Sequence, residues 1–504
     1  MKKVFYASLL LLHSTCLSAQ LTWQRSYDLV PGGTPRNSDI GLQIYPSGDG
    51  YLLLTGTLFD NNTTNGFGLY RIDSHGDVLL KKAFLNTENP MRAFGQDMML
   101  ELPSGDIVIT GDQHTNDFPD ISRVFLMKLT SEGDSIWMHT YNNEWLDFPD
   151  AVVQTPDGGF LIEGSGGSDI QDIFLLKTDS NGIEQWNKRL GMTDQFRYSV
   201  YGNLIALNDG GFAVGYIAAN YISNNEYTQV VRLDELGNIL WHKEFYEQQF
   251  CSPTLRKDNA GNLILITCVD TLIAPWFNPY VMFVTKIDTA GNILWEFAFD
   301  SDVIRSHGDI EVAANGDILV AGLRRDEDTL YDKAWIARVS GEGELLWEKT
   351  YSVEPTNPFS IFWLYDIEAC SDAGMIVSGL IVEEPVSGVY DGNAWVMKLD
   401  ENGCFLSNEC QENNIIVSAA NLPILPQQEI GLYPNPASGT LHIALPEGIP
   451  ELEVAVYDLA GKLMQRQMVS NETALPLNQQ GVFILAFFRE GVWVATKKIV
   501  NIPR

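Results

Sequence analysis

Short apolar runs, each preceded by a turn, recur along most of this chain. In every instance a turn rich in Gly, Asp or Asn leads into an apolar run that ends on a small residue, as in residues 48–56, 157–164 and 315–322. The seven closing residues lie at positions 56, 111, 164, 215, 267, 322 and 379, with spacings of 55, 53, 51, 52, 55 and 57 residues. A nearly fixed period of this length is typical of a repeat architecture.

A second motif lies between these runs and defines the content of one repeat. It is an apolar segment followed by a turn that ends in Gly and then usually by Trp, as in residues 174–186 and 284–295. Each period therefore holds about four short strands and shows no helical periodicity. Four-stranded sheets repeated radially form a β-propeller, whereas the repeats of a linear β-solenoid are much shorter. The sequence predicts an all-β fold containing a seven-bladed β-propeller.

The two ends of the repeat region predict how the ring closes. A Trp-bearing strand ends most units, but the seventh unit runs through Gly403 without one. A spare strand at residues 21–27 precedes the first unit and is similar to residues 346–351. We expect this N-terminal strand to complete the last blade, which removes two open sheet edges. Roughly residues 21–405 resemble the bacterial WD-repeat-like and quinoprotein-like propellers, a resemblance that concerns architecture and not activity.

The N-terminal residues have the pattern of a secretory signal peptide. Lys2 and Lys3 precede an apolar stretch at residues 4–12, and a small-residue exit ends at Ala19. We expect cleavage after Ala19; the alternatives are a short buried helix or lipidation at Cys16. No internal apolar run reaches the roughly 18–20 residues that span a bilayer, so no transmembrane helix is expected in the mature chain.

Export makes disulfides possible, because they persist outside the cytoplasm. Cys251 and Cys268 flank a tight turn symmetrically, so they should face each other across a hairpin at a distance that permits a disulfide. Two reduced, buried thiols are the alternative. Cys404 and Cys410 can close a second, small loop, which leaves Cys370 unpaired as a core residue.

The C-terminal part of the chain differs from the repeats. After a signal peptide at residues 1–19 and the propeller at residues 20–410, we expect a linker at residues 411–428 and a separate domain at residues 429–504. This last segment carries six basic and seven acidic residues, so the acidity of the chain belongs almost wholly to the repeat region. Short alternating strands separated by turn residues predict a small Ig-like β-sandwich.

An ordered set of motifs in this segment is similar to the type A sorting domain of the type IX secretion system. Its residues are Pro434, Asn435, Pro436, Gly461, Lys497 and Lys498. The resemblance implies a protein that is secreted or carried to the outer cell surface, with the type IX secretion machinery and a sorting protease as partners of residues 429–504. Phe483 stands where members commonly have Tyr. An ordinary C-terminal binding sandwich is the alternative.

Charge and motif content argue against several functions. Lys+Arg 32 and Asp+Glu 65 give a net charge of −33, which repels phosphate backbones and argues against nucleic acid. Because His and Cys lack metal-ligand spacing and no nucleophile elbow occurs, we assign no catalytic, cofactor-binding or metal-ligating residue and expect no cofactor. The Gly-turn-Trp motif resembles sialidase Asp boxes and the repeats of pyrroloquinoline-quinone enzymes, but it differs in register from the former and lacks a cofactor cradle. We interpret it as a turn with Gly at positive φ and a Trp that packs between blades.

An acidic residue recurs where the innermost strand of a blade is expected to begin. These residues are Asp39, Asp97, Asp150, Asp309 and Asp366. If their carboxylates face the central channel, they form a negative ring that attracts a cation. Alternatively they cap backbone N–H groups at the connections between blades, and we favour this interpretation. The acidic segment 326–332 lacks the central Gly of a calcium loop.

Long connections are expected on one face of the ring, and long loops on a rigid scaffold are where binding usually resides. Five aromatic residues in these loops are candidates to stack on a sugar or clamp a peptide, with packing of the loops on themselves as the alternative: Trp276, Phe277, Phe359, Phe362 and Trp363. We expect a binding or scaffold protein with an unidentified glycan or protein ligand rather than an enzyme. The alternatives are an extracellular propeller enzyme, glycan-active or quinone-dependent, and a structural envelope protein with no discrete ligand.

Overall fold

The computed structural model describes residues 22–28, 38–59, 63–85, 89–93, 95, 97–115, 121–141, 147–167, 172–190, 198–220, 225–247, 252–270, 280–299, 304–325, 332–354, 361–382, 392–405, 414–418, 430–434, 437–445, 449–458, 463–470, 473–477, 479–489 and 492–501. Contacts divide the chain into two compact units, one made mainly of residues 20–416 and the other mainly of residues 417–504. The regular elements of the described residues are β-strands, and none of these residues belongs to a helix that could cross a membrane.

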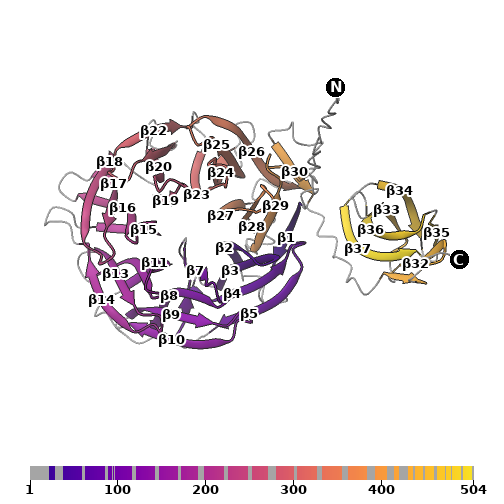
Figure 1. Ribbon diagram of the computed structural model, residues 1–504, viewed down its shortest axis with the longest axis horizontal. Coiled ribbons are helices and arrows are strands. Elements are labelled where there is room, and N and C mark those ends of the chain that lie inside the picture. Colours follow the sequence, from indigo (N-terminus) through magenta and orange to yellow (C-terminus); the bar gives the residue numbers. More distant parts are fainter. Residues whose placement is uncertain are drawn as a thin grey trace, which may run out of the picture. The chain divides into compact units, whose positions relative to one another are not determined.

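Seven antiparallel sheets form the larger unit and surround a central axis (Figure 1). We number these blades in chain order, and each innermost strand comes first. Blade 1 consists of β2 (Ser38–Ser47), β3 (Gly50–Phe59), β4 (Thr63–Asp73) and β5 (Val78–Leu85). Blade 2 consists of β6 (Met91–Arg92) and β7 (Met99–Glu101), both beside β8 (Ile107–Thr115), then β9 (Ile121–Leu129) and β10 (Ser135–Tyr141).

The next three blades follow the same order. Blade 3 consists of β11 (Asp147–Gln154), β12 (Phe160–Gly166), β13 (Asp172–Thr178) and β14 (Glu184–Arg189). Blade 4 consists of β15 (Tyr198–Ala206), β16 (Phe212–Asn220), β17 (Asn225–Leu233) and β18 (Ile239–Glu247). Blade 5 consists of β19 (Thr254–Lys257), β20 (Leu263–Asp270), β21 (Tyr280–Ile287) and β22 (Ile293–Ala298).

The last two blades recruit strands from elsewhere in the chain. Blade 6 consists of β23 (Ile304–Val312), β24 (Ile318–Arg325), β25 (Asp332–Val339) and β26 (Leu345–Glu354), with β30 (Asn414–Ser418) added beside β26. Blade 7 consists of β27 (Ile361–Ala369), β28 (Met375–Val382), β29 (Gly392–Leu399) and β1 (Trp23–Tyr27). The seven sheets agree with the seven predicted blades.

The N-terminal strand closes the ring as the sequence predicts. β1 pairs antiparallel with β29, with Trp23 opposite Lys398 and Ser26 opposite Trp395. The indole N–H of Trp395 also donates to the side-chain oxygen of Gln24 at 3.0 Å. Because β1 occupies the outer edge of β29, the seventh sheet joins the beginning of the propeller to its end.

Trp residues and Gly turns connect neighbouring blades, as the sequence analysis proposed. Gly403 follows the third strand of blade 7 at φ 72°, and a Cβ at this position would lie 2.7 Å from the ring of Trp347 in blade 6. The hydroxyl of Tyr351 donates to the Gly403 carbonyl at 2.7 Å. The same contact joins Tyr27 to Gly76 and Tyr141 to Gly182. Gly at these turns therefore permits both the positive φ and the close approach of the ring.

Ion pairs stabilise the turn between the first two strands in six blades. A Lys or Arg near the end of the third strand pairs with an Asp of that turn in Asp106–Lys128, Asp157–Lys177, Asp209–Arg232, Asp258–Lys286, Asp317–Arg338 and Asp372–Lys398. Lys177 is almost fully buried, with 5% of its side chain exposed. Although burial acts in the opposite direction, hydrogen bonds from Thr155 and Lys177 lower the pKa of Asp157 to about 2. Six acidic residues of the chain therefore stabilise the hairpins between the first two strands of the blades.

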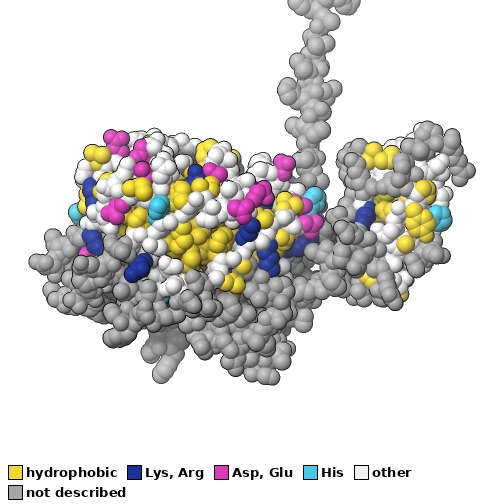
Figure 2. Space-filling model, turned by 90° about the horizontal axis from the view of Figure 1, so that it is seen from below, with side chains coloured by type: hydrophobic (Ala, Val, Ile, Leu, Met, Phe, Trp, Pro, Cys, Tyr) yellow, Lys and Arg dark blue, Asp and Glu magenta, His cyan; other side chains and the backbone are white. Residues whose placement is uncertain are grey.

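Aliphatic side chains are exposed where the outer strands begin. They include Val78, Leu79, Ile136, Ile183, Ile239, Leu240, Ile293, Leu294, Leu345 and Leu346. Figure 2 shows hydrophobic side chains gathered on the wall of the propeller unit that faces the viewer.

The C-terminal unit consists of two antiparallel sheets around one apolar core. One sheet contains β31 (Gly431–Tyr433), β32 (Thr440–Ala444) and β35 (Thr473–Pro476). The other contains β33 (Glu451–Asp458), β34 (Leu463–Ser470), β36 (Gly481–Arg489) and β37 (Val492–Asn501). Their shared core includes Leu441, Val454 and Leu485.

The described cysteines have three environments. Cys268 and Cys404 each take part in a disulfide bond. Their predicted partners, Cys251 and Cys410, lie outside the described residues, so the pairing stays a prediction. Cys370 is a free, half-buried thiol beside the ring of Tyr51, and burial raises its pKa to about 11.

Candidate functional site

The innermost strands are held together by contacts that run from each blade to the next. Gln43 in blade 1 accepts the backbone N–H of Met99 in blade 2 at 2.8 Å, and Asn203 in blade 4 accepts that of Leu255 in blade 5 at 2.8 Å. Between blades 2 and 3, the N–H of Val152 donates to a backbone carbonyl at 2.8 Å. Side chains therefore replace the strand partner that these backbone groups lack at the channel.

Two of the recurrent Asp residues act as such caps. Asp150 in blade 3 accepts the N–H of Gly202 in blade 4 at 3.3 Å, and Asp366 in blade 7 accepts the N–H of Ile44 in blade 1. Capping is therefore confirmed for these two residues, while the side chain of Asp39 lies outside the described part of the chain. Asp97 and Asp309 have a different role.

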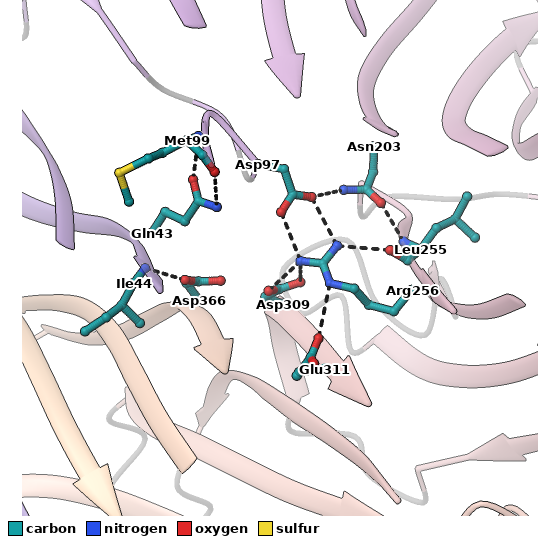
Figure 3. Close-up of polar contacts among 10 residues, drawn as sticks. All are labelled: Gln43, Ile44, Asp97, Met99, Asn203, Leu255, Arg256, Asp309, Glu311 and Asp366. Atoms are coloured by element: carbon teal, nitrogen blue, oxygen red, sulfur yellow. Dashed lines mark hydrogen bonds and ion pairs between the residues drawn. The ribbon is translucent and has the colours of Figure 1, made fainter. Parts of the chain in front are cut away.

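Asp97 and Asp309 bind the guanidinium of Arg256, which belongs to β19 of blade 5 (Figure 3). One guanidinium nitrogen of Arg256 lies 2.8 Å from both carboxylate oxygens of Asp309, and the other lies 3.1 Å from Asp97. Glu311 lies 3.8 Å from the third nitrogen, and Asn203 donates to Asp97 at 2.6 Å. The guanidinium of Arg256 thus provides the positive charge that the sequence analysis expected an acidic ring to attract.

Burial changes the charge of this cluster. It raises the pKa of Glu311 to about 7, and it raises the pKa of Glu368 and of Asp366 well above the ordinary range. Burial by itself lowers the pKa of Arg256, but Asp309, Asp97 and Glu311 raise it well above its usual value. Its neighbours therefore keep Arg256 charged, while burial favours the neutral form of part of the acidic ring. In the part of the chain that the structure describes, no group of three or more His, Cys, Asp or Glu could hold a metal ion.

Two further buried carboxyl groups, those of Asp150 and Glu163, lie near Gly202, between blades 3 and 4. Glu163 on β12 is fully buried, and neither of its carboxyl oxygens has a hydrogen-bond partner among the described residues. A Cβ on Gly202 would lie 1.8 Å from one of these oxygens. Burial, and next the nearby Asp150, raise the pKa of Glu163 well above its ordinary value, and burial raises that of Asp150 to about 7. Burial therefore favours the protonated form of both carboxyl groups.

A partly exposed polar cluster lies where β6, β8 and β11 adjoin the connections between strands. One oxygen of Asp112 accepts two hydrogen bonds from Arg92, at 3.0 and 2.6 Å, and lies 2.8 Å from a ring nitrogen of His114. Ser122 donates to the same oxygen at 3.2 Å. The ring of Phe148 lies beside both Arg92 and His114, at 5.8 and 6.2 Å. Arg92 and His114 keep 26% and 17% of their side chains exposed, so this cluster is within reach of a ligand.

The aromatic residues predicted to contact a ligand fall in different places. Phe362 lies on β27, where it is buried against Trp395 at 6.0 Å, so its assignment to an exposed loop surface is wrong. Strand alternation turns its neighbour Trp363 to the other face, where it stacks on Tyr365 at 5.3 Å and stays partly exposed. The other three candidates, Trp276, Phe277 and Phe359, lie outside the described residues.

The cluster around Asp112 was missed by the sequence analysis. Asp112 and His114 lie two residues apart on β8, so the alternation of a strand places them on one face. That spacing is a signal that the sequence does contain. Arg92 and Phe148 come from other strands, and only the pairing of Arg92 with Asp112 and the adjacent blade bring them to the site.

The residues of the sorting motifs lie in the C-terminal unit. Pro434 follows β31 and is exposed, and Lys497 lies on β37, where burial lowers its pKa. Lys498 is the next residue of β37, and the structure describes its backbone only. Asn435, Pro436 and Gly461 lie outside the described residues.

Comparisons with known proteins identify the C-terminal unit. Residues 431–501 match the model of the secretion system C-terminal sorting domain. The protein is therefore a propeller-bearing cargo of the type IX secretion system, exported to the cell surface or the extracellular space. No curated protein matches the chain.

Solved structures resemble the chain only distantly. A polysaccharide lyase, Uly1, is 9% identical over 72% of this chain and 90% of its own, with a TM-score of 0.47. A puromycin hydrolase is 12% identical over 83% and 61%, with a TM-score of 0.44. An exo-1,5-alpha-L-arabinanase from a bovine ruminal metagenomic library is 11% identical over 63% and 97%, with a TM-score of 0.30. Likeness at this level implies no substrate or activity for this chain.

Arg256→Gln is expected to destabilise the propeller in a pH-dependent way. The change leaves buried carboxylates without their counter-charge, which costs about 3–5 kcal/mol of unfolding free energy at pH 8. At pH 5 the loss should be smaller, because Glu311, with a pKa of about 7, is then protonated. Urea unfolding at the two pH values measures the difference. The control Arg325→Gln, in a more exposed pair with Asp332, should cost about 1 kcal/mol or less. Equal losses at both pH values for Arg256→Gln would contradict this account.

Glu163→Gln is expected to flatten the pH dependence of stability. Because the pKa of Glu163 in the folded protein lies above its value of 4.5 in a free chain, the wild type loses stability as the pH rises through the folded-state pKa. The amide cannot ionise, so the variant should match the wild type near pH 4 and exceed it by about 1–3 kcal/mol once Glu163 has ionised. Thermal melts across pH 4–9 test this, with the exposed Glu344→Gln as the control. A variant that is less stable at every pH would show that Glu163 makes a required contact.

Proposed function

We propose that this cargo protein binds an extracellular ligand and acts as a binding or scaffold module rather than as an enzyme. The observation that carries this proposal is the use of the polar groups at the centre of the ring. Asp150, Asp366 and Asn203 cap neighbouring blades, and Asp97 and Asp309 hold Arg256. Groups engaged in holding the blades together are not available to bind substrate or transfer protons.

The domain organisation that we propose follows the route of export. A signal peptide at residues 1–19 directs the chain across the inner membrane, and the propeller at residues 20–410 is the cargo. A linker at residues 411–428 joins it to the sorting domain at residues 429–504, which the sorting protease removes. The match of residues 431–501 to the sorting-domain model supports the last step.

We also propose the disulfides Cys251–Cys268 and Cys404–Cys410. The bonded state of Cys268 and Cys404 supports them, as does delivery to an oxidising compartment. Trp276, Phe277, Phe359 and Trp363 remain proposed contacts for a glycan or protein ligand. Of these, the structure describes Trp363, which is partly exposed.

A glycan-active or quinone-dependent enzyme is the alternative, and one observation favours acid–base chemistry. Asp150 and Glu163 are adjacent carboxyl groups with raised pKa values, a feature often found at catalytic sites. Glu163 is nevertheless fully buried, so a substrate would have to open the contact between blades 3 and 4 to reach it.

Mass spectrometry of surface and medium fractions tests the export route. We expect mature protein outside the cell that lacks residues 431–501, because the sorting domain is removed on attachment or release. A variant that lacks residues 429–504 should accumulate in the periplasm instead of crossing the outer membrane. Unchanged export of this deletion variant would overturn the proposed role of the segment.

Binding and turnover assays on the purified full-length protein separate the two functional classes. We expect retention on a glycan or protein ligand without any change in the ligand. Release of a reaction product, abolished by Glu163→Gln, would favour the enzyme. Neither binding nor turnover would favour a structural envelope protein.

A further inference from the structure

The cluster around Asp112 has an unusual distribution of hydrogen bonds. Arg92 and Ser122 donate hydrogen bonds to one oxygen of Asp112, and a ring nitrogen of His114 lies 2.8 Å from the same oxygen. Among the described residues, the second oxygen of Asp112 has no partner. Arg92 uses Nε and Nη2 for Asp112, and the described residues place no acceptor on Nη1. Within the described part of the chain, this ion pair therefore keeps one acceptor, on Asp112, and one donor, on Arg92, without a partner.

The rest of the cluster holds these two groups in place. Arg92 and Asp112 are directly paired residues of β6 and β8, so the backbone fixes their separation. Asp112 is buried, with 7% of its side chain exposed, and Ser122 beneath it is also buried. The half-buried ring of Phe148 adds an apolar surface beside the guanidinium. The leftover groups are therefore ordered before any ligand arrives, which lowers the entropic cost of binding.

We propose that Arg92, Asp112, His114 and Phe148 bind an uncharged saccharide; this rests on the proposed binding function. A sugar hydroxyl both donates and accepts, so one hydroxyl can donate to Asp112 while its neighbour accepts from Arg92. Hydrogen bonds to charged groups are stronger than those between neutral groups. The C–H groups of a sugar ring pack on an aromatic side chain such as Phe148.

Charge favours an uncharged ligand over an acidic one. Arg92 is neutralised by Asp112 at 2.6 Å, so it offers hydrogen bonds without a net positive charge. The chain as a whole carries a net charge of −33, which repels polyanions. A neutral polymer rich in hydroxyl groups needs no net positive charge at the site and is not repelled by the negative charge of the chain.

The test measures binding of the full-length protein to immobilised neutral polysaccharides (laminarin, xylan, arabinan and galactan) and to the acidic polymers alginate and heparin. We expect retention by at least one neutral polymer, and a loss of affinity of about tenfold or more in Arg92→Gln and in Phe148→Leu. Phe148→Leu keeps an apolar side chain, so it separates loss of binding from loss of folding. Arg324→Gln is the matched control, because Arg324, on the second strand of blade 6, is likewise a partly exposed arginine, with 24% of its side chain exposed, and it pairs with Glu348 at 2.8 Å. Melting temperatures confirm that each variant is folded.

Each other outcome overturns the proposal in a distinct way. Equal binding by the wild type, Arg92→Gln and Phe148→Leu would place the saccharide elsewhere and leave the binding function intact. Retention by alginate or heparin alone, lost at high salt, would show that the ligand is a polyanion. A folded protein that binds none of the six polymers has no saccharide site of this kind. The proposed binding function fails separately, if turnover is found or if no protein ligand is bound either.

Discussion

The innermost strand of each blade has no further strand on its inner side, so its backbone N–H and C=O groups need other hydrogen-bond partners. The propeller depends on how these groups are satisfied. The innermost strands of neighbouring blades belong to separate sheets, and side chains and single backbone contacts bridge them. Gln43, Asn203, Asp150 and Asp366 each reach the next blade, and Arg256 reaches Asp309. Asp309 and Asp366 hydrogen-bond to each other and so link blade 6 to blade 7. The centre of the propeller unit is therefore a continuous ring of polar contacts that runs from each blade to the next.

The acidic residues near the axis of the propeller are explained by these contacts within the protein, so their presence does not imply a bound ligand. Arg256 is surrounded by Asp97, Asp309 and Glu311, and burial raises the pKa of Glu311 and Glu368, which favours their uncharged forms and so reduces repulsion. At the opposite ends of the blades, acidic turns pair with Lys or Arg of the third strand. Acidic residues that recur in register are thus part of the scaffold. Asp112 is neither one of the recurrent Asp residues of the ring nor one of the turn Asp residues, so the cluster around it stands apart from the scaffold.

The periodic features of the fold could be predicted, because each depends on residues close in sequence. The seven repeats, the Gly turn with its Trp and the spare N-terminal strand all follow local patterns. The identity of the caps could not be predicted in full, because Asn203 replaces Asp in blade 4 and Arg256 enters from blade 5. The assignment of Phe362 to a long loop fails because β27 already begins at Ile361, and the position of Phe362 on this strand buries its ring. The site around Asp112 needs three strands, and a sequence pattern cannot show which residues of separate strands adjoin.

The closing strand has a consequence for the time course of folding. Gln24 and Trp395 are 371 residues apart in sequence, yet they lie in one sheet. Contacts between such distant residues must wait until the intervening chain is available, and they slow folding. The seventh sheet cannot be completed until β29, which ends at Leu399, is available to pair with β1, so a chain that stops before β29 cannot close the ring. Residues 23–27 must therefore stay unpaired until the first six blades have been synthesised. A truncated chain that lacks β29 could not form the closed propeller.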